Sequence, residues 1–136
     1  MKFFDYIFFR ITSLYLNTFN DRNGESIGSL FLSLLQLFIL LFILLLVAVF
    51  DEKINEIIFT NFFNNSKFRY WKILTALIIL GFNFYRYFSI KNYSKLKSVW
   101  IFESSDTKRR NGWLITCFSI IIFCGTIGLA IIRQSL

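Results

Sequence analysis

Three long apolar stretches dominate the pattern of hydrophobic and polar positions in this chain. The first, residues 27–50, has no charged residue, and Gln36 is its only strongly polar side chain. At about 1.5 Å per residue, a helix of this length measures roughly 36 Å, which is enough to cross a hydrocarbon core of roughly 30 Å. We therefore predict a transmembrane helix over residues 27–50.

Two further apolar stretches follow, at residues 71–88 and 113–132. The stretch 113–132 is uncharged throughout, whereas the stretch 71–88 contains Lys72 and Arg86 near its ends. The uncharged centre of 71–88 is short enough for a re-entrant segment. However, Lys72 and Arg86 can extend their charged ends toward opposite interfaces, so a full crossing is the better interpretation. We predict transmembrane helices over both stretches.

Residues 1–26 are predicted to form an amphipathic N-terminal helix and a turn. Asp5 and Arg10 fall on the polar side of this helix. Its apolar side, at helical spacing, contains Phe3, Phe4, Ile7, Phe8, Ile11, Leu14, Tyr15 and Thr18. The pattern indicates a helix in the membrane interface; the alternative is that the apolar stripe packs on another part of the protein. The predicted fold class is an all-α membrane protein, with three transmembrane helices preceded by an amphipathic interfacial helix.

The distribution of Lys and Arg predicts the orientation. Ten of the 15 fall in the N-terminal segment or around residues 89–112, and five fall around residues 51–70 or in the tail 133–136. By the positive-inside rule, the N-terminus and the basic loop 89–112 are cytoplasmic, while loop 51–70 and the C-terminus are external. The default location is the inner (plasma) membrane of a bacterium.

Composition restricts the function classes. The chain is 56% hydrophobic, carries a net charge of +7 and contains no His. Its basic residues lie beside apolar stretches, so the expected partner is the lipid bilayer and not a nucleic acid. Without His, clustered carboxylates or a nucleophile beside a base, we predict no catalytic, cofactor-binding or metal residues and no enzyme. Cys117 and Cys124, about 10.5 Å apart on one helix, are too far apart for a disulfide.

A stripe of residues in the third apolar stretch is the predicted helix-packing face. Cys117, Ile121, Cys124 and Gly128 recur at steps of four and three. Small side chains let helix backbones approach closely in lipid. The partner is either the first transmembrane helix or the same helix of another copy. Ile122 falls on a different face, and we expect Ile122→Leu to be silent.

Gln36 and Asn83 are the deepest strong hydrogen-bonding side chains inside the bilayer. They meet if their helices are offset or tilted, and they act either as structural contacts or as a pore-lining pair. No acidic residue lies within a predicted span, which disfavours a proton-driven transporter.

Lys108, Arg109 and Arg110 form a basic cluster immediately before Trp113. Such a juxtamembrane cluster with an aromatic anchor is typical of a topology determinant, and also of a weak site for anionic lipid.

Several segments carry a resemblance to other proteins. They are FDYIFFRITSLYL (4–16), NFYRYF (83–88), Trp100-x-x-Glu103, KRRNGWL (108–114) and AIIRQSL (130–136). In these the chain resembles a group of uncharacterised small bacterial three-span membrane proteins. The resemblance implies three spans and an amphipathic start, and it implies no activity.

We expect a non-enzymatic small integral membrane protein, an accessory or scaffold subunit that binds another membrane protein or itself. The alternative is a small pore-forming protein of the holin or toxin kind. Size and basic loops suit the alternative, but no span shows a polar stripe that could line water.

Overall fold

The computed structural model describes residues 2–18, 23–50 and 67–134, and these are helical apart from short connections. The elements are α1 (Lys2–Thr18), α2 (Gly24–Phe50), α4 (Lys67–Tyr85), the π-helix η2 (Arg86–Ile90), α5 (Tyr93–Trp100) and α6 (Ser105–Gln134). Within the described ranges there is no strand. The predicted all-α fold class is therefore confirmed.

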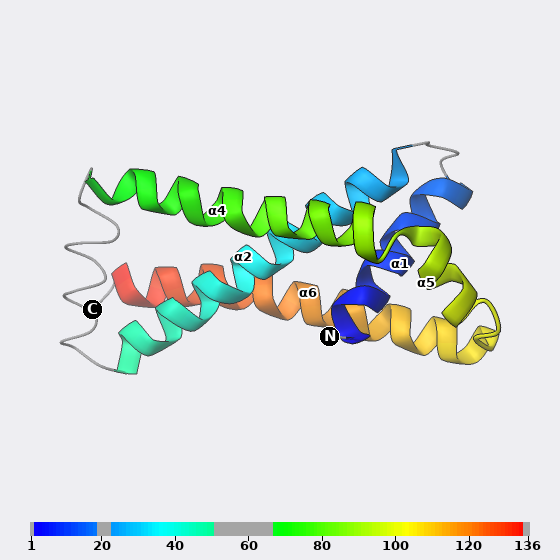
Figure 1. The fold of residues 1–136 in the computed structure, drawn as a ribbon. Helices are drawn as coiled ribbons and strands as arrows, with labels where there is room; N and C mark the ends of the chain where they lie inside the picture. The colour runs from blue at the N-terminus through cyan, green and yellow to red at the C-terminus, as the bar shows by residue number, and fades with distance from the viewer. Residues whose placement is uncertain (1, 19–22, 51–66, 135–136) are drawn as a thin grey trace.

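Three helices are long and apolar enough to cross a membrane, as predicted. They are Gly24–Phe50, Arg69–Ile90 and Ser105–Ile132. In Figure 1 they run along the length of the molecule, with α2 crossing obliquely between α4 and α6. The main contacts of both α4 and α6 are with α2. The long helix α2 is thus the central element of the bundle.

The remaining helices gather at one end of the bundle. Figure 1 shows α1 lying across the long helices, close to α5, where α2 and α6 begin and where α4 ends. We call this the α1–α5 end; it comprises α1, η2, α5 and the first turns of α2 and α6. The hydrophobic core also lies here, and it includes Ile7, Phe8, Leu32, Tyr87 and Leu96.

The apolar stripe of α1 packs on the protein itself, which was the alternative reading of its pattern. Ile7 and Phe8 are fully buried. The two helices lie close together at Gly28 of α2, where a Cβ would meet the Thr12 hydroxyl and lie 3.2 Å from the Phe8 ring. The placement of Asp5 on a polar face was wrong, since Asp5 is only 5% exposed. The reason is that α1 is covered by α2 on one side and by η2 and α5 on another. A position in the membrane interface stays a prediction.

Several predicted boundaries differ from the helix ends. The segment 67–70, expected in a loop, begins α4, and α6 begins at Ser105 instead of residue 113. Ser104 supports this early start because its Oγ accepts a hydrogen bond from the Thr107 amide at 3.3 Å. The basic loop 89–112 therefore contains α5 and the first turns of α6. At the C-terminal side, α6 continues to Gln134, into the predicted tail. Residues 1, 19–22, 51–66 and 135–136, which include most of the predicted external loop, lie outside the described residues.

Candidate functional site

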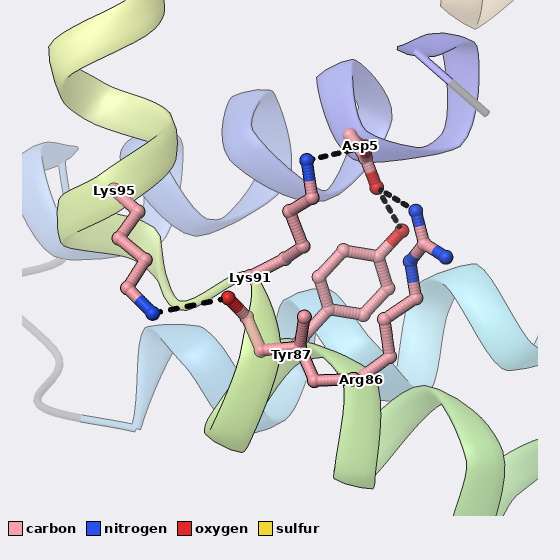
Figure 2. A network of polar contacts seen from close by, with 6 residues as sticks. Asp5, Arg86, Tyr87, Lys91 and Lys95 are labelled. Atoms are coloured by element: carbon pink, nitrogen blue, oxygen red, sulfur yellow. Dashed lines mark hydrogen bonds and ion pairs between the residues drawn. The ribbon is translucent and has the colours of Figure 1, made fainter.

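A buried carboxylate at the α1–α5 end, that of Asp5, is paired with side chains from η2 and from the residue that follows it. The Arg86 Nη2 atom donates to Asp5 Oδ1 at 2.8 Å, and the Tyr87 hydroxyl donates to the same oxygen at 3.1 Å. The Lys91 ammonium lies 3.8 Å from Asp5 Oδ2. Figure 2 shows these three side chains converging on Asp5 from one side. We call these four residues the Asp5 cluster.

The π-helix η2 provides Arg86 and Tyr87 of this cluster, and Lys91 follows its last residue. It closes with a hydrogen bond from the Lys91 amide to the Arg86 carbonyl at 2.7 Å, a wide turn of a kind that usually occurs singly within α-helices. The Lys95 ammonium also donates to the Ile90 carbonyl at 3.2 Å. This bond ties α5 to the end of η2.

Packing fixes the aromatic member of the cluster. Tyr87 is 1% exposed, and its ring stacks on Phe8 with centroids 4.1 Å apart and an interplanar angle of 14°. The Arg86 guanidinium carbon lies 5.6 Å from the centroid of the same ring, which is within cation–π range. The ring is therefore held by α1 while its hydroxyl reaches the carboxylate.

The electrostatic balance of the cluster follows from burial. A carboxylate taken out of water is costly unless it is paired and hydrogen-bonded. Asp5 meets this requirement with a guanidinium, an ammonium and a phenol. The guanidinium and the phenol donate hydrogen bonds to the carboxylate and the ammonium forms an ion pair with it, so the arrangement suits the joining of two helices better than proton transfer. Sequence reasoning missed the burial of Asp5, because its position on the predicted helix indicated a face exposed to water.

Two more carboxylates join elements at this end. The Tyr6 hydroxyl donates to the Glu103 carboxylate at 2.7 and 2.9 Å, and Asn111 Nδ2 donates to it at 3.0 Å. Burial, together with this bond to Glu103, raises the pKa of the Tyr6 phenol. Glu25 Oε1 accepts a bond from the Tyr93 amide at 3.1 Å, at the start of α5. Each of these carboxylates thus connects segments that are distant in the sequence.

The predicted pair Gln36 and Asn83 does meet. Asn83 is 1% exposed, and its Nδ2 atom donates to Gln36 Oε1 at 2.8 Å and to Ser33 Oγ at 3.0 Å. Ser33 in turn donates to the Ser29 carbonyl at 2.8 Å. Sequence reasoning missed Ser33, although it lies one turn before Gln36 on the same face of α2. We call Ser33, Gln36 and Asn83 the amide cluster.

The predicted packing stripe of α6 does not face the other described helices. Cys117 and Cys124 are exposed, and Ile121 is 64% exposed. A Cβ built on Gly128 would meet no atom within 4 Å. The stripe therefore does not pack against α2, which leaves another copy as its remaining predicted partner.

The face of α6 that does pack against α2 is a different one. Ile115 and Thr126 are buried there, and Ile122 is only 8% exposed. A Cβ on Gly125 would come within 2.7 Å of the Phe42 ring on α2. Ile122 thus lies on a different face from the stripe, as expected, and the silence of Ile122→Leu stays a prediction. The small residues of α6 do not mark its contact with α2, because this helix is apolar on every side.

The basic cluster Lys108, Arg109 and Arg110 is exposed on the first turns of α6. A fourth cation, which sequence reasoning had assigned to the polar face of α1, lies close to it. Arg10 Nη2 donates to the Lys108 carbonyl at 3.1 Å, and Gly112 leaves room for it, since a Cβ there would lie 3.3 Å from the same atom. The sequence separation of about 100 residues gives no local signal for this contact.

No group of three His, Cys, Asp or Glu side chains in the described part of the chain could hold a metal ion. Comparison with protein-family models, with curated proteins and with solved structures gave no match. The segments that carry the resemblance do come together: Asp5, Tyr6 and Arg10 of the first contact residues of the second, third and fourth. The candidate functional site is therefore the α1–α5 end.

Proposed function

We propose that this chain is a non-enzymatic small integral membrane protein that serves as an accessory or scaffold subunit of a larger membrane assembly. The observation that carries the proposal is the internal use of the buried polar side chains. The Asp5 cluster and the amide cluster are bonded within themselves and join helices to one another. This arrangement gives a fixed frame whose outer helix faces remain available.

The outer face of α4 is the most open of these surfaces. Only 11% of the most apolar part of the helix Arg69–Ile90 is buried inside the structure. Trp71 and Ile78 are exposed on it, and a Cβ on Gly81 would meet no atom within 4 Å. A glycine between large apolar residues allows a second helix to approach closely in lipid. We propose this face as the contact with the larger assembly.

The proposed location is the inner membrane of a bacterium, with the α1–α5 end in the cytoplasm and the C-terminus outside. The support is the ten-to-five division of Lys and Arg between the two sides. Reporter fusions after Phe102 and Leu136 should report cytoplasm and exterior respectively. A cytoplasmic signal at Leu136 would contradict a full crossing by the second span.

Site-specific photo-crosslinking tests the accessory role in the intact cell. A crosslinking amino acid at Ile78, on the outer face of α4, should yield an adduct with one distinct membrane protein. The matched control is Leu32, which is fully buried and should give no adduct. If neither Ile78 nor the exposed Ile121 on α6 gives a protein adduct, the accessory role is wrong.

A leakage measurement separates this role from pore formation. The side chains of the amide cluster hydrogen-bond to one another, and the remaining walls of the spans are apolar, so we expect no conducting path. Induction of the protein alone should leave the membrane potential unchanged. Rapid depolarisation that the Gln36→Leu variant abolishes would overturn the accessory role in favour of a pore.

A further inference from the structure

A cleft of about 570 Å³ lies between the C-terminal half of α1 and the first turns of α6. Three cationic side chains line it: Arg10 from α1, and Lys108 and Arg109 from α6. Arg10 is held across the cleft by its bond to the Lys108 carbonyl at 3.1 Å. Two helices that are remote in sequence thus place three positive charges around one cavity.

The charges in this cleft are not balanced by the described part of the protein. No Asp or Glu is among the lining residues. Nor does any described carboxylate lie within ion-pair distance of Arg10, Lys108 or Arg109. A neighbouring cleft of about 640 Å³, along the N-terminal half of α1, provides a contrast because Glu103 lines it. The local field therefore favours an anion in the first cleft only.

The other wall of the cleft is apolar. Leu14, Ile115 and Trp113 line it, and Trp113 is 67% exposed. The cleft lies at the end of a helix long enough to cross a membrane, Ser105–Ile132, and Trp is typical of the level where headgroups meet hydrocarbon. A ligand that fills this cleft must have an anionic end beside an apolar one.

We propose that this cleft binds an anionic phospholipid, with its phosphate group against Arg10, Lys108 and Arg109 and an acyl chain along the apolar wall. Arginine and lysine are the usual partners of phosphate oxygens. The inference is independent of the accessory role, because a bound lipid requires no protein partner.

The test uses the full chain in a neutral detergent, with short-chain phosphatidylglycerol as the probe. Ligand that binds the folded protein raises its unfolding temperature in a saturable way, from which the dissociation constant follows. Short-chain phosphatidylglycerol should stabilise the protein. Short-chain phosphatidylcholine and inorganic phosphate, tested at the same concentrations, should not.

Two variants locate the site. The double variant Lys108→Gln/Arg109→Gln should weaken phosphatidylglycerol binding by roughly tenfold or more, since each cation near an anionic group contributes about fivefold. Arg110→Gln is the control with a similar loss of charge, because Arg110 is exposed, adjacent in sequence and not part of the cleft. The affinity of this variant for phosphatidylglycerol should stay within about twofold of the wild-type value. All three side chains are exposed, so the variants should unfold at the wild-type temperature without lipid.

Four results would overturn the proposal. The first is no stabilisation by phosphatidylglycerol, and the second is equal stabilisation by phosphatidylcholine, which would reduce the site to an apolar groove. The third is equal binding of inorganic phosphate, which would make it an anion site without a lipid. The last is equal loss in Arg110→Gln, which would indicate diffuse charge attraction.

Discussion

The two buried polar clusters of this protein differ in charge although they lie on the same helical run. The amide cluster uses Asn83 of α4 and joins α4 to α2 through neutral groups. The Asp5 cluster uses Arg86, three residues later, and joins η2 to α1 through an ion pair of 2.8 Å. Charged groups at bilayer depth are expensive. The change from amide to guanidinium within one turn thus falls near the end of the apolar helix Arg69–Ile90, where that helix meets α1.

The two clusters also differ in what their loss would leave behind. Removing an amide leaves a neutral group without a partner, whereas removing Asp5 leaves a cation with little access to water. Arg86 has an 18% exposed side chain. Buried charges without partners cost several times more than unpaired neutral groups. The comparison therefore predicts a rank order of substitutions, with the charged end first.

The largest effect is expected for Asp5→Ala. It removes the carboxylate from Arg86, Tyr87 and Lys91, and breaking a buried ion pair in this way costs about 3 kcal/mol or more. The protein in mild detergent should unfold at a clearly lower temperature. The control is Asp106→Ala, since Asp106 is exposed in the first turn of α6 and should change little.

A second substitution sharpens this prediction. In Asp5→Ala/Arg86→Leu, both charges of the pair are gone, so part of the lost stability should return. Equal heat resistance of the Asp5→Ala and Asp106→Ala proteins would show that the ion pair does not hold α1 to η2.

The next largest effect is expected from overpacking the contact between α1 and α2 at Gly28. Gly28→Leu places a side chain where the Thr12 hydroxyl and the Phe8 ring already lie. Overpacking of this kind costs about 3 kcal/mol at its upper end, so α1 should separate from α2 and become sensitive to protease. Gly81→Leu provides the control, because no atom lies within 4 Å of a Cβ there. If both variants resist protease equally, α1 does not pack closely on α2.

The sequence was sufficient to locate the three helices that are long and apolar enough to cross a membrane, because a long apolar stretch is recognised without reference to any partner. The sequence also singled out Gln36 and Asn83, but their contact depended on an offset or tilt of the two helices, which only the structure provides. The burial of Asp5 could not be predicted in the same way. A helical wheel assigns one face of α1 to water, but η2 and α5 fold back over that face through contacts 81 and more residues away.

The packing face of α6 was unpredictable for another reason. A helix with apolar residues on every side has no pattern that points to its partner. The small residues suggested one stripe, whereas the observed contact uses Ile115 and Ile122 beside Gly125. Only the position of Phe42 on α2 explains why Gly125, and not Gly128, lies at the contact.

A matched pair of substitutions in the spanning region tests this face. Ile122→Ala removes a side chain that is 8% exposed and directed at α2, whereas Ile121→Ala removes one that is 64% exposed. Ile122→Ala should lower the free energy of unfolding by about 2 kcal/mol, the lower end of the range for a buried Ile to Ala change. Ile121→Ala should leave it nearly unchanged. The unfolding temperatures in detergent measure the difference. The opposite order would restore the stripe of Cys117, Ile121, Cys124 and Gly128 as the contact within the chain.

The smallest effect is expected in the amide cluster, and it completes the comparison with Asp5. Asn83→Leu leaves Gln36 and Ser33 without their shared donor, and interhelical hydrogen bonds in membranes are worth about 0.6 kcal/mol on average, up to about 2 kcal/mol. Gln36→Leu should cost a similar amount, and the double variant should cost less than the sum because both remove one bond. Unfolding temperatures of the four proteins give this coupling. A loss for Asn83→Leu as large as that for Asp5→Ala would show that charge is not what separates the two clusters, since a neutral amide would then hold the helices as strongly as the ion pair.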